Sequence, residues 1–150
     1  EPLTGAEALT AAPDFTRGES NRAGRLVLDG LAPNVDTVFV KADGYAVQRA
    51  MFEADQTDPV EVRLDAGVTV EGLLQDAHGL PVPDMELNFY GDFDQRVTRT
   101  DANGRYRCRM LSVNAPYSVS LRDRALETSL GPIQTSAAAT QTIDLTLPAD

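Results

Sequence analysis

The feature that most constrains this chain is a short stretch in which charged and apolar side chains alternate without exception. Residues 105–110 are Arg-Tyr-Arg-Cys-Arg-Met. A period of two places the apolar side chains on one face of an extended strand and the guanidinium groups on the other, whereas a helix would spread both kinds around its surface. The preceding residues 101–104, Asp-Ala-Asn-Gly, are typical of a tight turn. The pattern therefore predicts a strand, a turn and a second strand with one buried face.

Other parts of the chain carry β-rich or alternating segments separated by Gly, Pro, Asn and Asp. The predicted strands or extended segments lie at residues 25–29, 37–42, 45–47, 60–64, 68–75, 85–90, 117–121 and 142–147. Residues 1–10 are rich in alanine, which favours a helix, but the internal repeat described next predicts a strand there instead.

The chain contains an internal repeat, because Gly24-Arg25 recurs as Gly104-Arg105 80 positions later. Further pairs at or near this spacing are Leu31 with Leu111, Phe39 with Val119, Pro2 with Pro81, Glu7 with Glu86, and Leu9 with Asn88. The repeat predicts two copies of one fold unit, at residues 1–66 and 67–150, joined by a linker so short that they should be nearly rigid relative to each other.

The second copy begins with the strand at 68–75, and no segment ahead of Pro2 corresponds to it. We therefore expect the first copy to lack its opening strand and the chain to be a fragment of a larger protein. A missing strand leaves an unpaired sheet edge, which predicts β-augmentation and a possible edge-strand dimer.

The charge balance argues against some partners. There are 23 acidic and 13 basic residues, a net charge of −10, which opposes binding to nucleic acid and to anionic membranes. No apolar run of the length of a membrane span is present, so no membrane insertion by this fragment is predicted. The single cysteine, Cys108, excludes an intramolecular disulfide.

Three stretches together resemble the carboxypeptidase regulatory-like domain family. They are residues 70–87, with the Gly-Leu-Pro-Val-Pro-Asp loop, residues 98–106 around Thr-Asp-Ala-Asn-Gly-Arg-Tyr, and residues 116–119, Pro-Tyr-Ser-Val. The resemblance implies an all-β fold of two tandem transthyretin-like, Ig-like Greek-key β-sandwiches. It also implies an accessory module of secreted, periplasmic or surface proteins, usually without catalysis. The fold alone does not supply a function.

Residues suited to catalysis are few. The only histidine, His78, falls in a predicted loop, and Cys108 alternates with core residues as a small buried hydrophobe would. One histidine and one cysteine argue against zinc and non-haem iron sites. We therefore predict no enzyme activity and no cofactor.

Calcium is a further candidate ligand, because it binds to oxygen atoms that loops can supply. Asp76, Asp84, Asp101 and Asn103 should lie at one end of the predicted strands. The alternative is that these residues only form turns, with Asp accepting backbone N–H bonds.

Arg105, Arg107 and Arg109 could bind an anionic sugar, a lipid head group or an acidic peptide. The alternative is a solvated sheet face paired with acidic neighbours. Phe93, in an acidic loop, is the best candidate for an exposed aromatic contact with carbohydrate.

These observations favour a non-catalytic accessory module, a structural spacer or protein-interaction domain of a larger extracytoplasmic protein. Its partners would be other domains of that protein or a separate protein. A carbohydrate-binding module is the alternative, and a hydrolase is a third reading with less support.

Overall fold

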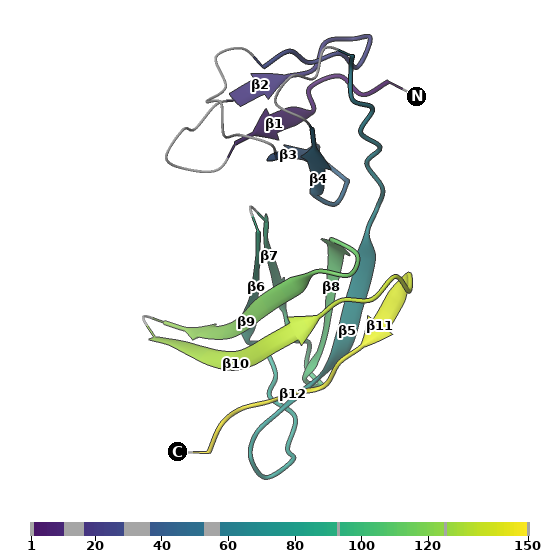
Figure 1. The fold of residues 1–150 in the computed structure, drawn as a ribbon. Coiled ribbons are helices and arrows are strands. Elements are labelled where there is room, and N and C mark those ends of the chain that lie inside the picture. The colour runs from purple at the N-terminus through teal and green to yellow at the C-terminus, as the bar shows by residue number, and fades with distance from the viewer. Residues whose placement is uncertain are drawn as a thin grey trace. The chain divides into compact units, whose positions relative to one another are not determined.

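The structure is a computed structural model and describes residues 2–10, 17–28, 37–52, 58–92, 94–124 and 126–149. Across these ranges the secondary structure consists of β-strands, with no helix (Figure 1), so the predicted all-β class is confirmed. Consequently none of the described segments is a helix long and apolar enough to cross a membrane. The chain divides into two compact units, Glu1–Ala66 and Gly67–Asp150.

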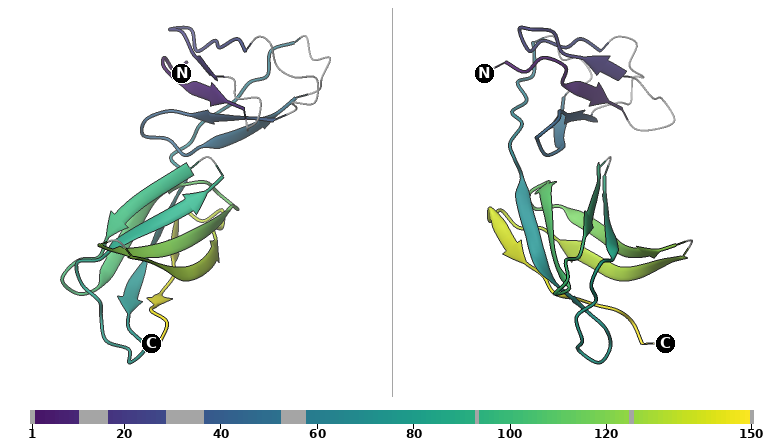
Figure 2. Two further views of the ribbon diagram at one scale, coloured as in Figure 1. Left: turned by 90° about the vertical axis from the view of Figure 1, so that its left-hand side faces the viewer. Right: turned by 180° about the vertical axis from the view of Figure 1, so that it is seen from behind.

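The second unit contains two sheets (Figures 1 and 2). Its strands are β5 (Val68–Gln75), β6 (Glu86–Gly91), β7 (Asp94–Arg99), β8 (Arg105–Leu111), β9 (Pro116–Asp123), β10 (Leu126–Gln134), β11 (Thr140–Thr142) and β12 (Leu145–Thr146). One sheet is antiparallel with the order β10-β9-β6-β7. In the other sheet β5 is central, with β8 antiparallel on one edge and β11 and β12 parallel on the other.

A single hydrophobic cluster draws side chains from both sheets of the second unit. Val70 and Leu74 of β5, Leu87 and Phe89 of β6, and Leu111 of β8 are all fully buried. Burying a side chain of this size stabilises the fold by about 1.5–3 kcal/mol, so this cluster holds β5, β6, β8 and β9 together.

Strand β8 follows the predicted alternation up to a bulge. Tyr106 and Cys108 are buried and the arginines are exposed, as predicted. Met110 was expected to share the buried face, but its φ of 62° breaks the pattern and leaves it half-buried, while Leu111 is fully buried. The pairing of β8 with β5 shifts at this point, which is the effect of an extra residue in one strand.

The first unit is a single antiparallel sheet across its described residues. Its strands are β1 (Glu7–Leu9), β2 (Arg17–Glu19), β3 (Thr37–Lys41) and β4 (Gln48–Met51), in the order β2-β1-β3-β4. The first sheet of the second unit has the matching order β7-β6-β9-β10. The central pairing also matches in register, since Ala8 lies opposite Val40 and, 80 positions later, Asn88 lies opposite Ser120.

The repeat extends to individual hydrogen bonds in the turns. Asn21 Oδ1 accepts hydrogen bonds from the backbone N–H of the second and fourth residues after it, at 2.9 and 3.1 Å. Asp101 Oδ1 accepts the same two bonds at 2.8 and 3.0 Å. Both residues close the same type of turn, because a short side-chain carbonyl oxygen can replace a backbone acceptor.

The hydroxyl group before each of these turns is also repeated. Ser20 Oγ accepts a hydrogen bond from the Ala6 N–H at 2.9 Å and donates one to the Leu3 carbonyl at 2.6 Å. Thr100 Oγ1 makes the same two bonds, at 2.8 and 2.9 Å, with the residues 79 positions further along the chain. The two units therefore share these side-chain hydrogen bonds at an offset of 79–80 residues.

Two predicted strands of the first unit do not form. Residues 25–28 and 60–64 are described, and neither segment is a strand. Their counterparts in the second unit are β8 and the β11–β12 segment, all of which pair with β5. Because strands need a hydrogen-bonded neighbour, the alternation of these two segments is not sufficient to make them strands. The structure also contains β2 and β10, which the sequence did not predict.

Candidate functional site

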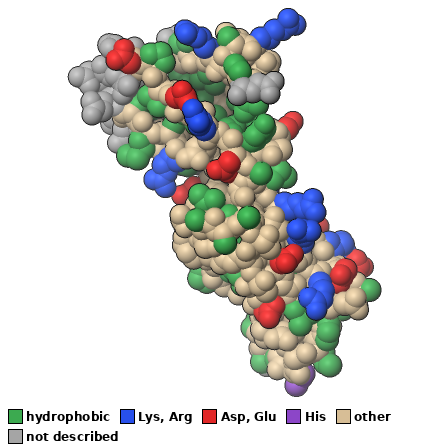
Figure 3. Space-filling view, turned by 90° about the vertical axis from the view of Figure 1, so that its right-hand side faces the viewer, with side chains coloured by type: hydrophobic (Ala, Val, Ile, Leu, Met, Phe, Trp, Pro, Cys, Tyr) green, Lys and Arg blue, Asp and Glu red, His purple; other side chains and the backbone are tan. Residues whose placement is uncertain are grey.

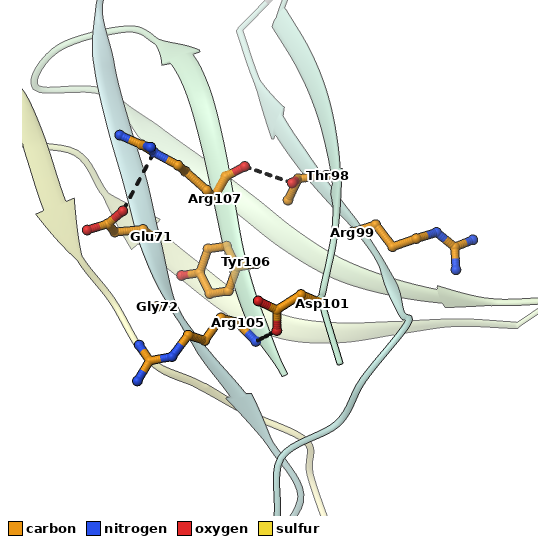
Figure 4. Close-up of a pocket in the computed structure, with 8 residues that line it drawn as sticks. All are labelled: Glu71, Gly72, Thr98, Arg99, Asp101, Arg105, Tyr106 and Arg107. Atoms are coloured by element: carbon orange, nitrogen blue, oxygen red, sulfur yellow. Dashed lines mark hydrogen bonds and ion pairs between the residues drawn. The ribbon is translucent and has the colours of Figure 1, made fainter. Parts of the chain in front are cut away.

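An open groove of about 400 Å³ lies in the second unit beside strand β8 (Figure 4). Strands β5, β7 and β8 and the turn after β7 supply its lining. The lining residues are Glu71, Gly72, Thr98, Arg99, Asp101, Arg105, Tyr106 and Arg107. The set includes two of the three arginines that the sequence singled out, Arg105 and Arg107, whereas Arg109 does not line the groove.

The arginines of the groove do not converge on one point. Arg107 faces Glu71 directly across the β5–β8 pair, with 3.6 Å between Nε and Oε2, and both side chains are exposed to solvent. The guanidinium group of Arg105 lies apart from that of Arg107, and that of Arg99 points away from both (Figure 4). The groove therefore presents mixed charges. Figure 3 shows the same mixture of basic and acidic side chains over one face of this unit.

The segment between β11 and β12 approaches β5 closely at Gly72, one of the residues that line the groove. A Cβ atom on Gly72 would lie 2.0 Å from the carbonyl oxygen of Ile143, so only glycine allows this approach. The Tyr106 hydroxyl donates a hydrogen bond to the same carbonyl. Asp144 Oδ1 accepts one from the Leu73 N–H at 2.9 Å. Burial raises the pKa of Tyr106, with Asp144 contributing in the same direction, so this hydroxyl is a structural donor.

The calcium candidates are engaged in turns and an ion pair. Asp76 Oδ1 accepts hydrogen bonds from the His78 and Leu80 N–H groups at 2.8 and 2.9 Å, and these backbone donors, the Leu80 N–H first, lower the pKa of Asp76. Asp101 closes the equivalent turn, in which Asn103 contributes its N–H as one of the two donors. This is the local role of such residues in turns.

Asp84 is the remaining calcium candidate, and its Oδ1 lies 2.7 Å from Nη1 of Arg99. Over the described ranges, no group of three or more His, Cys, Asp or Glu side chains is gathered as a metal ion would require. The structure thus places these carboxylates in separate contacts and does not bring them together.

Cys108 and His78 occupy contrasting positions. Cys108 is only 2% exposed, and burial raises the pKa of its thiol to about 12, so the nucleophilic thiolate is suppressed at neutral pH. His78 projects into solvent at the tip of its turn (Figure 3). Phe93, the aromatic candidate, lies outside the described residues.

A buried carboxylate that the sequence did not single out lies next to Phe93 in the chain. Asp94 Oδ2 accepts a hydrogen bond from the Tyr117 hydroxyl at 2.7 Å, and its Oδ1 lies 3.3 Å from Nε of Arg96. The Tyr117 oxygen also accepts a bond from the Ser112 N–H. Burial, with the Asp94 carboxylate adding to it, raises the pKa of Tyr117 to about 12. This network joins β7, the β8–β9 loop and β9.

A second polar cluster, also missed by the sequence, lies on the antiparallel sheet of the second unit. Glu127 accepts a hydrogen bond from the Ser120 hydroxyl, and bonds from Ser120 and Tyr90 lower the pKa of Glu127. Tyr90 is 39% exposed. Asn88, paired with Ser120 across β6 and β9, is 2% exposed and has no hydrogen-bond partner for its Nδ2. No sequence signal pointed to this cluster, because Glu127 lies on the unpredicted strand β10.

No protein-family model matches the chain, and no curated protein matches it. Among solved structures, the chain is similar to the Bacillus anthracis TIE protein, with 12% identity and a TM-score of 0.33; the match covers 98% of this chain and 31% of that one. The shaft pilin SpaA from Lactobacillus rhamnosus GG is 9% identical, with a TM-score of 0.38 and coverage of 100% and 90%. The Streptococcal ancillary pilin is 12% identical, with a TM-score of 0.39 and coverage of 98% and 58%. Likenesses this weak carry no functional argument.

Proposed function

We propose that the chain is a non-catalytic accessory module, a structural spacer or protein-interaction element of a larger extracytoplasmic protein. Its two units are tandem transthyretin-like Greek-key β-sandwiches of the carboxypeptidase regulatory-like type, and no strand among the described residues of the first unit corresponds to β5. Its partners are other domains of the same protein or a separate protein. The observation that carries the proposal is the repeat of strand order, register and turn hydrogen bonds at an offset of 79–80 residues.

The roles of the reactive side chains support a structural function. Asp76 and Asp101 close turns, Asp94 anchors Tyr117, and Cys108 is buried in the core. A catalytic group must be able to reach a substrate in the protonation state that the chemistry needs. Each of these groups instead satisfies a backbone or core partner.

The junction between the units fits a spacer. The boundary falls between Ala66 and Gly67, and strand β5 starts at Val68. Because only Gly67 lies between the boundary and strand β5, we expect the two units to tumble together. Backbone 15N relaxation tests this expectation, with a matched variant carrying about six Gly-Ser residues inserted after Ala66 as the flexible reference. The spacer proposal is supported if the two units have equal rotational correlation times in the native chain and unequal ones in the Gly-Ser variant. Independent tumbling of the units in the native chain contradicts it.

A carbohydrate-binding module remains the second candidate, favoured by the cluster around Tyr90. A half-exposed tyrosine ring beside Glu127, with the unpaired Nδ2 of Asn88 beneath the surface, provides both a stacking face and hydrogen-bonding groups. Sugar sites commonly combine these two elements, an apolar ring face and a few fixed polar groups.

Thermal unfolding in the presence of soluble glycans, anionic oligosaccharides, calcium or EDTA separates the two candidates. Ligand at a hundredfold excess over its dissociation constant stabilises a protein by about 2.7 kcal/mol. The accessory-module proposal expects no shift across the panel. A glycan-dependent rise in melting temperature that Tyr90→Ala abolishes and Tyr45→Ala preserves would replace it with the carbohydrate-binding function.

A further inference from the structure

The second unit shows what a completed copy of this fold contains. Strand β5 is the only strand with which β8, β11 and β12 form backbone β-pairing within the described residues. Its side chains alternate, with Val68, Val70, Gly72 and Leu74 buried and the intervening residues half-buried. The second sheet therefore depends on β5 for every pairing.

One segment of the first unit corresponds to β8, a neighbour of β5 in the second unit. Residues 25–28 correspond to the start of β8, with Leu26 and Leu28 half-buried and Val27 76% exposed. A Cβ on Gly18 of β2 would lie 2.7 Å from Leu28 and 3.4 Å from the Val27 carbonyl oxygen. In the second unit, the corresponding Thr98 of β7 donates a hydrogen bond to the β8 carbonyl at the same position. Segment 25–28 thus lies beside β2 as β8 lies beside β7.

The other neighbour is residues 60–64, the counterpart of the β11–β12 segment. Val62 and Leu64 are half-buried, whereas Glu61 and Arg63 are exposed, which is the alternation of a strand with one covered face. Within the described ranges, neither this segment nor 25–28 belongs to a strand. Both have the pattern of the strands that flank β5, and none of the described strands of the first unit is a counterpart of β5.

We propose that the first unit is an acceptor for one added β-strand, which pairs antiparallel with residues 25–28 and parallel with residues 60–64. Main-chain hydrogen bonds along both edges give such strand addition its affinity, and alternate side chains give it specificity. This inference rests on the internal repeat and is independent of the proposed accessory function.

The chemistry of the donor follows from β5. It is an extended segment of about eight residues with small or apolar side chains at alternate positions. Glu71 of β5 lies opposite Arg107, whose counterpart in the first unit is the exposed Val27. The donor should therefore carry an apolar or β-branched residue at that position, because cross-strand pairs of this type are favourable.

The donor must be a segment that is not already part of a sheet. The β5 strand of a second copy is the centre of its own sheet, and its Val70 and Leu74 are fully buried. A second copy could donate it only by unfolding its own second unit. We therefore assign the acceptor site to a free extended segment with the β5 pattern, and not to a second copy of this chain.

The test supplies such a strand at the correct distance. The turn after β5 ends at a bridge between Gln75 and Pro81, and Pro2 is the counterpart of Pro81. Fusing a copy of residues 67–80, carrying Glu71→Val, directly before Pro2 of the full chain therefore reproduces the native spacing. The matched control has the same fusion with Val70→Asp and Leu74→Asp in the added copy only, which removes the apolar alternation.

The readout is backbone amide hydrogen exchange by NMR, with the strands of the second unit as an internal reference for folding. We expect exchange in residues 25–28 and 60–64 to slow by about tenfold or more in the matched fusion and to stay unchanged in the control. No slowing in the matched fusion, or equal slowing in the control, overturns the proposal. Concentration-dependent dimerisation of the unfused chain that protects residues 25–28 also overturns it, because a second copy would then be the donor.

Discussion

Replacing Gly72 by alanine tests whether the last strands of the second unit are held by one close backbone approach. The new Cβ would lie 2.0 Å from the Ile143 carbonyl oxygen, and ordinary contact begins at 3.4 Å, so the β11–β12 segment must retreat by about 1.4 Å. That movement breaks the bond from the Ile143 N–H to the Glu71 carbonyl, which is 2.8 Å long. It also breaks the bonds that Tyr106 and Asp144 make across the same strands.

Three hydrogen bonds at about 1 kcal/mol each give a loss of roughly 3 kcal/mol. For a unit of this size, we expect the melting temperature to fall by roughly 12–24 °C. The melting of β5 amides, followed by NMR, reports the second unit separately from the first. Gly79→Ala is the control, because Gly79 has open space around it and only its φ of 82° makes alanine costly, by about 1–2 kcal/mol. If Gly72→Ala melts at or above the temperature of Gly79→Ala, the close approach does not hold these strands.

Three other outcomes are expected. Thr100→Val should lower the stability of the second unit by about 2–3 kcal/mol in denaturant unfolding, because a buried N–H and a carbonyl lose their partner, whereas Thr100→Ser should retain most of it. The Cys108 thiol should react with a thiol reagent only at the rate of unfolding, since burial raises its pKa to about 12; fast labelling of the folded chain would contradict this. The pKa of Tyr117 is raised from 10.0 to about 12, so its contribution is fully present below pH 10 and is lost as the pH rises through 12. Melting temperatures between pH 9 and 12 should therefore fall less steeply in Tyr117→Phe than in the native chain.

The strands that the sequence predicted correctly are those with a clear apolar pattern and a partner in the fold. Strand β5 and strand β9 formed at the predicted places, because their alternation matches a core on one side. The turn at Asp101 was also predictable, since its chemistry is local. Local sequence patterns of this kind can be interpreted without knowing the tertiary structure.

Strand β10 could not be predicted, although it has nine residues. It contains Gly131 and Pro132, which normally interrupt a strand. The structure accommodates them because the pairing shifts between Ser129 and Gly131, where Gly131 has a φ of 108°, and because β10 is the outer strand of its sheet. The cluster at Tyr90 and Glu127 was missed for the same reason, since it depends on the register of this strand.

The strand predicted at residues 60–64 does not form, and the physical reason differs from that for β10. The alternation there is as regular as in β5, yet alternation specifies only which face is buried and not which chain supplies the hydrogen bonds. In the second unit one strand supplies them to all three of its neighbours. Among the described residues of the first unit no strand takes the place of β5, and the segments at 25–28 and 60–64 do not form strands, while the sheet built from β1 to β4 does form. An alternating segment without a backbone partner is therefore consistent with the strand addition proposed for the first unit.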